Sequence, residues 1–600
     1  MLDEYLKPVF VFLEAHREKM ASYVAGLSVD EARWILVAFV LTQWILHTSI
    51  NFLNVANLNK PLDPLIPKLY GESVLQKYEK SKAYIREKNT FGEVMGIFDN
   101  AVMFVFWFAH GYPWLNNTLK EALPTVSPAV FGTIYLLTLT YVSSIISLPW
   151  GYYSNFVLEE KYGFNRMTIK TWLKDTIKGW LLMGVLGGVF MYIFLLILVN
   201  FAVEKYWWLL ASFIMSFQLV MMILQPWIMK LFLEFIAIED GVAFVSRGQT
   251  DKFMRNRYFY PAGENLWETR DSQYKGQPKG ACLVLRKDAD DKWIIADKTS
   301  SSSTSGEKQS DAAAKELDST AVVHATATSA GGSLPSDVSS WDYSREEEEK
   351  AESSLLDTKV DDPLDQKPLW MKKLDFGDLR GRLESMAAEH KFKFQAVYII
   401  DGSTRSEHSN AFFMGFAWFR KICLFDTLLK NLSVDSVCGI MGHEMGHCVM
   451  KHIPRQIFYG AVQSFFMLWV MAQFLYNKTL HAAFFVDVSK PDNITPWIGL
   501  LITQMAMAPI GFFLGLWKNW LTRKYEYEAD AFAVQSFNKN YAQDLVNGLK
   551  GLLMENKSHL NPHWLFVWMN HSHPTLVQRV RWIQGLSTKR EGKDIVKLDD

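Results

Sequence analysis

The sequence has few cysteines and few charged residues for its length. Its four cysteines are scattered along 600 residues without a CxxC pair, so they predict neither a disulfide framework nor a thiolate zinc site. They are Cys282, Cys423, Cys438 and Cys448. Charged residues make up only 21%, and the formal net charge is -1. The chain therefore lacks the excess of basic residues that is typical of a nucleic-acid-binding domain. We therefore expect reduced cysteines and no nucleic-acid partner.

The chain is instead rich in apolar and aromatic residues. Hydrophobic residues make up 49% and aromatic residues 14%, which is more than a soluble protein usually carries. The mean hydropathy of +0.01 is the average expected when membrane spans are combined with a large polar segment. Residues 1–33 lack the apolar core and small-residue cleavage site of a signal peptide, so we expect no cleaved leader.

Apolar runs of about 20 residues, the length that spans a bilayer as a helix, occur seven times. They cover residues 34–54, 95–115, 127–150, 179–202, 206–236, 457–476 and 496–518. His110, Gly111 and Pro113 interrupt the second run, so an interfacial or re-entrant segment is an alternative there. The predicted fold class is an all-α multi-pass membrane protein with about seven transmembrane helices and a small cytosolic α+β domain.

The distribution of lysine and arginine predicts the orientation. The loops after runs one and three carry twelve of these residues, and the loops after runs two, four and six carry four. Basic loops stay on the cytosolic side, so residues 237–456 and 519–600 are expected there. The sequon at Asn116 would then be lumenal and could carry a glycan if it lies far enough from the membrane.

Two regions between the spans differ in composition. Residues 299–362 are rich in Ser, Ala, Thr and Glu with almost no large apolar residue, which predicts disorder and a segment that can be deleted with little loss. The stretch ACLVLRKDADDKWIIADK predicts a hairpin with Asp290-Asp291 at its turn. Residues 391–417 predict a second hairpin that leads into a helix over 433–451.

The most informative motif is His443-Glu444-Met445-Gly446-His447. Four residues of α-helix turn the chain by about 400°, so the two imidazoles lie one turn apart on one face, with Glu444 beside them. This is the arrangement for a zinc ion with an adjacent general base. The alternative interpretation of the pentapeptide is that its two histidines are ordinary helix residues whose ring nitrogens have hydrogen-bond partners and bind no metal.

A catalytic zinc ion takes three protein ligands and keeps one position for water. Glu526, in KYEYEADAFA, is the candidate third ligand, and two membrane crossings separate it from the histidines, so both can meet on one side. Asp530 lies one helical turn later and is expected to accept a hydrogen bond from a zinc-bound histidine. Without the histidine pair, Glu526 and Glu528 would simply indicate a solvated helix face.

The segment MNHSHPTLVQR supplies two further polar candidates. His573 is expected to stabilise the oxyanion, and Arg579 to hold a substrate carboxylate. Four other histidines are interpreted as surface or packing residues, namely His110, His452, His481 and His563.

With these residues, the chain resembles the type I CaaX prenyl endopeptidases, integral-membrane zinc proteases of the endoplasmic reticulum. The matching segments are EEKYGFNRMT (159–168), DGSTRSEHSNAFFMGF (401–416), HEMGH (443–447), EYEADAFA (526–533) and HSHPTLVQR (571–579). Five motifs in order, with seven spans, cover nearly the whole chain except about 240–370.

The resemblance implies one zinc ion per chain, bound by His443, His447 and Glu526, with Glu444 as catalytic acid and base. It implies a gluzincin-like protease domain and helices that enclose a water-filled chamber. The expected substrates are prenylated CaaX proteins, cleaved to release the last three residues, at the endoplasmic reticulum membrane and also the inner nuclear membrane. Membrane lipid is the other expected partner.

Three features depart from the family pattern. The insert at 240–370 is longer and more acidic, and LQPWIMKLFLEF replaces the usual Pro-Leu-Phe-Asn stretch. Glu528 stands where Gln is usual, which offers the metal a second nearby carboxylate.

The mechanism expected is metal-assisted peptide hydrolysis, in which Glu444 takes a proton from water and returns it to the leaving amine. An extended substrate can pair with an edge strand through Ser409, Asn410 and Ala411. Two rivals stay open. One is a membrane quality-control zinc protease with the same motifs, and the other is a seven-span scaffold or transporter with an incidental zinc site.

The domain prediction divides the chain into five segments. They are a membrane domain (1–236), a largely disordered polar insert (237–370), the hairpin and HExxH helix (371–456), spans six and seven (457–518) and the part with the third ligand (519–600).

Overall fold

The computed structural model describes eleven stretches of the chain. They are residues 23–24, 26–71, 74–237, 243–245, 257–263, 266–268, 283–287, 293–297, 376–415, 420–537 and 541–591. The chain divides into two compact units. Unit 1 comprises Met1–Ile228, Met445–Ser536 and Lys557–Asp600, and unit 2 comprises Met229–Glu444 and Phe537–Asn556.

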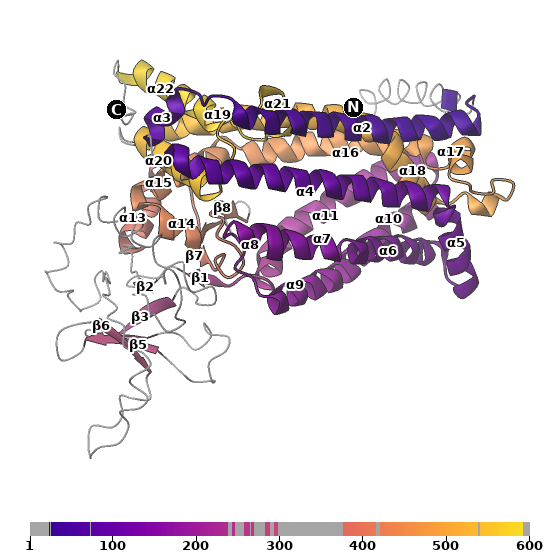
Figure 1. Cartoon of the computed structure of the whole chain (residues 1–600). Coiled ribbons are helices and arrows are strands. Elements are labelled where there is room, and N and C mark those ends of the chain that lie inside the picture. Colours follow the sequence, from indigo (N-terminus) through magenta and orange to yellow (C-terminus); the bar gives the residue numbers. More distant parts are fainter. Residues whose placement is uncertain are drawn as a thin grey trace, which may run out of the picture. The chain divides into compact units, whose positions relative to one another are not determined.

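Unit 1 is built from long apolar helices, several of which run side by side in Figure 1. They are α2 (Val29–Ala56), α4 (Val74–Phe108), α6 (Pro128–Ile146), α9 (Ile169–Leu182), α10 (Gly188–Asn200), α11 (Val203–Lys230), α16 (His452–Phe474), α18 (Pro496–Ala506) and α19 (Ala508–Ser536). A π-helical turn at Met183–Gly187 joins α9 to α10, and α2 packs against α4, α18 and α19. Within the described residues, six helices are long and apolar enough to cross a membrane, or seven if the bent pair α18–α19 counts as one span. The predicted multi-span helical class is confirmed.

Short helices connect and cap these spans. Unit 1 contains α3 (Leu65–Tyr70), α5 (Gly111–Ala122), α7 (Leu148–Tyr153), α8 (Glu159–Lys161), α17 (Lys478–Ala483), α21 (Trp564–Asn570) and α22 (Leu576–Glu591). Unit 2 contains α13 (Phe376–Glu389), α14 (Asp426–Asn431) and α20 (Tyr541–Glu555). Helix α15 (Val434–Val449) runs through the boundary between the units.

The second span differs from its prediction. It covers Tyr78–Phe108 rather than 95–115, because His110 adopts a left-handed conformation (φ 59°) that ends α4 and starts α5. Helix α4 already begins at Val74, so several basic residues counted as a loop lie on that helix. Asn116 is buried in α5, and its Oδ1 accepts a hydrogen bond from Trp497 Nε1 at 2.9 Å. The Asn116 side chain is therefore engaged inside the fold, and a glycan could be attached only if it left this position.

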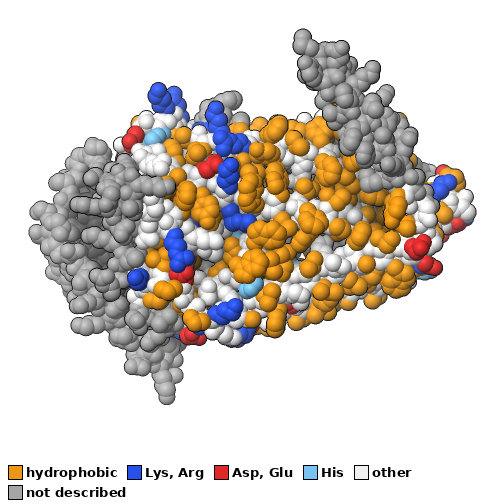
Figure 2. Space-filling model, turned by 90° about the horizontal axis from the view of Figure 1, so that it is seen from above, with side chains coloured by type: hydrophobic (Ala, Val, Ile, Leu, Met, Phe, Trp, Pro, Cys, Tyr) orange, Lys and Arg blue, Asp and Glu red, His pale blue; other side chains and the backbone are white. Residues whose placement is uncertain are grey.

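The surface of unit 1 has the character of a membrane protein. Figure 2 shows hydrophobic side chains over most of the visible helical face, with charged side chains gathered toward its ends. Only 6% to 33% of the most apolar window of each of the six single-helix spans is buried within the protein. Side chains such as Phe52 (72% exposed) and Val105 (68% exposed) therefore face the surroundings. Such apolar exposure along several helices is stable only against lipid.

The motif at 159–168 fastens α4 to the C-terminal part of unit 1. Tyr84 donates a hydrogen bond to Glu159 Oε1 (2.8 Å), and Lys88 pairs with the same oxygen (3.1 Å). Lys557 Nζ donates to the carbonyl of Tyr162 at 2.6 Å and lies 3.9 Å from the ring centroid of Phe164. This segment therefore holds the chain that precedes α21 and α22.

Unit 2 contains a four-stranded sheet of order β1-β7-β9-β8. Its strands are β1 (Phe235–Ala237), β7 (Ala396–Ile400), β9 (Lys421–Phe425) and β8 (Ala411–Met414). The prediction of a hairpin over 391–417 is wrong, because the buried apolar strand β9 lies between β7 and β8, parallel to the first and antiparallel to the second. The helix expected after it is present as α15.

A second sheet has the order β2-β3-β4-β5-β6. Its strands are β2 (Ala243–Val245), β3 (Arg257–Gly263), β4 (Leu266–Glu268), β5 (Leu283–Lys287) and β6 (Trp293–Asp297). The predicted hairpin is confirmed as β5 paired antiparallel with β6, although Asp290-Asp291 lies outside the described residues. The start of the insert thus carries strands rather than only disorder, and residues 299–362 also lie outside the described part. Three of the cysteines, Cys423, Cys438 and Cys448, form no disulfide bond among the described residues.

Candidate metal centre

Helix α15 carries the two histidines of the HExxH motif. Its first turn is capped by Ser433, whose hydroxyl accepts a hydrogen bond from the Ser436 amide at 3.2 Å. The continuous helix places His443 and His447 one turn apart on one face. His443 is 4% exposed, and the His447 side chain is 19% exposed. Glu444, next to His443, is half-buried, so its carboxylate keeps access to solvent.

Helix α19 brings the carboxylates to the same place. Glu526 and Asp530 lie one turn apart and are both buried. Gly446 explains why α15 and α19 approach so closely, since a Cβ atom there would lie only 3.0 Å from Ala529 Cα and 3.1 Å from its carbonyl oxygen. The glycine of HEMGH is thus a packing requirement that brings His447 to the helix of Glu526.

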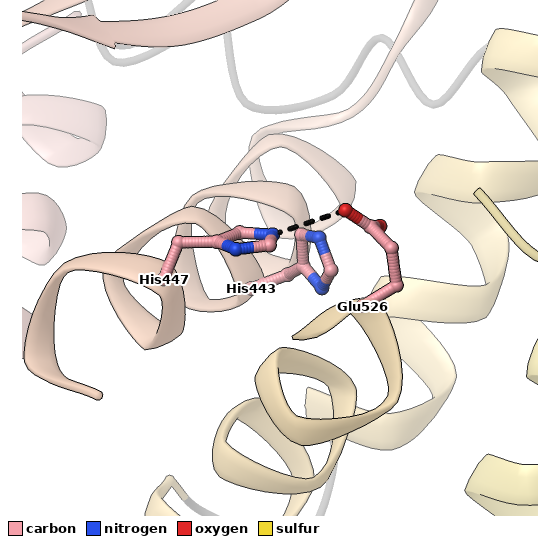
Figure 3. A group of neighbouring side chains, drawn as sticks. All are labelled: His443, His447 and Glu526. Atoms are coloured by element: carbon pink, nitrogen blue, oxygen red, sulfur yellow. Dashed lines mark ion pairs between the residues drawn. The ribbon is translucent and has the colours of Figure 1, made fainter. Parts of the chain in front are cut away.

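His443, His447 and Glu526 form a group that can hold a metal ion (Figure 3). Their ligand atoms all lie within 4.8 Å of one another, and His447 Nε2 is 3.3 Å from Glu526 Oε1. Ligand atoms about 2.0–2.2 Å from a tetrahedral zinc ion are roughly 3.3–3.6 Å apart. Two imidazoles and one carboxylate at this spacing therefore fit a zinc ion with a fourth position open.

Arg579, on α22, lies against the carboxylates of α19. Its Nε and Nη2 donate to the two oxygens of Asp530 at 2.9 and 2.5 Å, and its Nη1 is 3.6 Å from Glu526 Oε2. Both side chains of the bidentate pair are buried, 8% and 0% exposed. The observed contacts of Arg579 are with the protein's own carboxylates. A role in holding the substrate carboxylate stays a prediction, as does an Asp530 bond to a metal-bound histidine.

His573 lies beside the third candidate ligand. Its Nε2 is 3.4 Å from Glu526 Oε1, its side chain is 64% exposed, and its Nδ1 is 2.8 Å from the Ser572 hydroxyl. This position is accessible and close to the metal group. Burial lowers the pKa of the neighbouring His571, with the positive charges of His573 and Arg523 adding to the effect. The lowered pKa favours the neutral form of the His571 ring.

The predicted substrate strand is the edge strand β8 of the first sheet. Asn556 Oδ1 accepts a hydrogen bond from the Ser409 amide (3.2 Å), and the Asn410 carbonyl accepts one from the Phe425 amide (3.0 Å). The Ala411 amide donates to Asn410 Oδ1 at 2.9 Å. The segment is thus held in an extended form, although several of the groups proposed to pair with substrate already have partners.

The sequence reasoning missed His452, which it interpreted as a surface or packing residue. This side chain is buried and lies between His447 and Glu528, with a ring nitrogen 3.0 Å from each. Glu528, considered above as a second carboxylate for the metal, instead faces His452 and Arg455. A histidine five residues after a metal ligand was the available signal.

Comparisons with known proteins agree with this geometry. Residues 55–234 match the family described as CAAX prenyl protease N-terminal, five membrane helices, and residues 373–587 match peptidase family M48. The chain is similar to a probable CAAX prenyl protease 1 from Schizosaccharomyces pombe, 26% identical over 87% of this chain and 83% of the relative. It is also similar to CAAX prenyl protease 1 from Saccharomyces cerevisiae, 23% identical over 93% and 96%. The crystal structure of S. mikatae Ste24p shares the fold, with a TM-score of 0.63, 22% identity, and coverage of 92% and 98%.

Proposed function

We propose that this chain, which belongs to the metallopeptidase family M48, is a zinc metalloendopeptidase that removes the C-terminal tripeptide from prenylated CaaX proteins. The observation that carries the proposal is the group of His443, His447 and Glu526, with Glu444 next to the first histidine. The two full-length relatives named above are CAAX prenyl proteases, which supports this substrate class over other peptides.

The roles of the residues follow from their positions. A zinc ion, when bound by the three ligands, supplies a Lewis acid that polarises the peptide carbonyl and lowers the pKa of water toward about 7. Glu444, half-buried and beside the ligands, accepts the proton of the attacking water and passes it to the leaving amine. His573, exposed and 3.4 Å from Glu526, donates a hydrogen bond to the oxygen on which negative charge develops.

The substrate is expected to bind in an extended form along β8, with main-chain hydrogen bonds near Ser409, Asn410 and Ala411. Ala411 begins the strand and pairs with Leu424 of β9, and β8 is the last strand of this sheet within the residues that the structure describes. Arg579 remains the proposed clamp for the C-terminal carboxylate, which would compete with Asp530 for its guanidinium.

The membrane fold suits a lipid-anchored substrate. The low burial of the spans supports helices arranged around a chamber, since helices in a tightly packed bundle would bury more of their side chains. We place the catalytic side in the cytosol, at the endoplasmic reticulum and inner nuclear membrane, on the excess of lysine and arginine in the loops and at the start of α4 on that side.

The decisive experiment measures hydrolysis of a farnesylated CaaX peptide by the purified full-length protein in lipid. Mass spectrometry should detect the released tripeptide, and chelator or Glu444→Gln should abolish it. An unlipidated twin peptide is the matched control for substrate class. Equal cleavage of both peptides would favour a membrane quality-control protease, and no cleavage of either by zinc-loaded protein would refute the proposal.

A further inference from the structure

His452 is a buried histidine that contacts a metal ligand without belonging to the metal group. It is the first residue of α16 and follows Lys451, whose left-handed conformation (φ 59°) ends one helix and starts the next. This turn returns the chain toward α15, so His452 lies beside His447 and not in solvent. The His452 side chain is 1% exposed, and its ring stacks on Tyr525 at 4.3 Å between centroids and 12° between planes.

The two ring nitrogens of His452 have different partners. Nδ1 is 3.0 Å from Nδ1 of His447, and Nε2 is 3.0 Å from Oε2 of Glu528. Both nitrogens are thus engaged, one by the proposed ligand His447 and the other by Glu528, which lies outside the metal group. His452 is therefore not a fourth ligand, and it differs from a histidine that only fills space.

These contacts determine where the hydrogens lie. His447 presents Nε2 to the metal group, 3.3 Å from Glu526, so a metal-bound His447 carries its hydrogen on Nδ1. That N–H donates to Nδ1 of His452, which must then accept and carry its own hydrogen on Nε2. The Nε2–H donates to the Glu528 carboxylate, which can only accept. Every donor has one acceptor in this arrangement.

The carboxylate at the end is itself held in place. Arg455 lies 3.4 Å from Glu528 Oε2, and Lys524 lies 3.9 Å from Oε1. These two cations hold the Glu528 carboxylate against His452, and the Glu528 side chain is 24% exposed. Unit 1 contains every residue of this hydrogen-bonded series, from His447 through His452 to Glu528 and its two cations.

We propose that His452 and Glu528 form a hydrogen-bonded relay that fixes the ring orientation and tautomer of His447 for metal binding. His452 is then a positioning residue, and the carboxylate acts on the ligand through one intervening imidazole. Outer partners of zinc-bound histidines typically contribute 10-fold to 100-fold in metal affinity. The inference rests on the proposed role of His447 as a ligand, but not on the substrate.

The test measures zinc binding by the full-length protein in competition with a chromophoric chelator, with no peptide present. His452→Ala should weaken zinc binding by 10-fold to 100-fold. His452→Gln keeps an acceptor and a donor on one side chain and should recover much of the loss. Glu528→Leu should weaken zinc binding, whereas Glu528→Gln, which keeps an acceptor oxygen, should change it by only a few-fold.

The matched control is Lys518→Met, which lies on the same helix as Glu528 and is also exposed, and which should leave zinc affinity unchanged. Thermal unfolding of the metal-free variants separates lost packing from lost positioning. His452→Ala and Glu528→Leu should both melt near the wild type if only the relay is broken. The absorption spectrum of the Co²⁺-substituted protein gives a second readout, since a reoriented His447 changes the ligand field.

Wild-type zinc affinity in both His452→Ala and Glu528→Leu would overturn the relay. Equal weakening in His452→Ala and His452→Gln with no effect of Glu528→Leu would also overturn it, because packing alone would then explain the result. Neither outcome depends on prenyl-peptide cleavage, so failure of the substrate proposal is recognised separately.

Discussion

Replacing Arg579 with methionine should destabilise the protein strongly. The guanidinium makes two short hydrogen bonds to Asp530, whose side chain is 0% exposed. Methionine keeps most of the volume but leaves that carboxylate buried without its main counter-charge. Breaking a buried ion pair in this way costs about 3–5 kcal/mol. The Glu526 carboxylate, 3.6 Å away, also loses a neighbouring positive charge, so its position as a ligand should loosen.

The same helix offers a matched control. Arg581, two residues later, pairs with Asp63 at 2.9 Å, but its side chain is 59% exposed. Exposed pairs contribute about 0–1 kcal/mol, so Arg581→Met should barely change stability. A double variant, Arg579→Met with Asp530→Leu, removes both charges of the bidentate pair and should recover part of the loss, since only Glu526 then loses a neighbouring positive charge.

Thermal unfolding in detergent, followed by intrinsic tryptophan fluorescence, gives the ranking of the four proteins, and zinc content is measured beside it. The expected order is wild type and Arg581→Met highest, the double variant next and Arg579→Met lowest. If Arg579→Met melted like Arg581→Met while the KM for a CaaX peptide rose, Arg579 would act chiefly on substrate and the reasoning from buried charge would be refuted.

Three further predictions concern other parts of the chain. Glu444→Gln should keep bound zinc but lose peptide hydrolysis, because it removes the base and no ligand; metal analysis beside an activity assay checks this, and substantial residual turnover would contradict it. Burial, with the nearby Asp435 charge, raises the pKa of Asp544 from 3.8 to about 6, so its folded form holds the proton more tightly and its stabilising contribution is lost as the pH rises through about 6. Asp544→Asn should accordingly raise the unfolding midpoint at pH 7.5 and leave it unchanged near pH 4, and equal shifts at both pH values would argue against a charge effect. Gly439→Ala should destabilise by about 1–3 kcal/mol, since its Cβ would lie 2.5 Å from the Leu545 amide nitrogen, whereas Gly460→Ala meets nothing within 4 Å and should be neutral or slightly stabilising.

The spans and the HExxH helix could be predicted because their signals are local. A long apolar run is sufficient to indicate a helix in lipid, and two histidines four residues apart share a face whenever the segment is helical. The end of the second span could not be placed as well, because it depends on the left-handed backbone of His110. Apolar composition continues past that residue and carries no sign of the turn.

Contacts between distant segments were harder to predict. The order of the first sheet depends on the five-residue strand β9. The pattern of apolar residues in the sequence does not indicate that β9 pairs with β7 and β8. Arg579 and Asp530 are 49 residues apart, and the sequence alone suggested a separate role for each, one toward the substrate and one toward a metal-bound histidine. The sequence therefore indicated which residues gather at the metal group, but not which of them hold one another.

The separation between the halves of the metal group has a consequence for biogenesis. The proposed ligands His443 and His447 lie on α15 and Glu526 lies on α19, with α16, α17 and α18 between these two helices in the chain. A ribosome therefore delivers the HEMGH segment well before the residue that completes the group. Metal loading must wait until α19 has been synthesised and has packed on Gly446. The metal content of truncated nascent chains would accordingly serve as a marker for the synthesis and packing of helices α16 to α19.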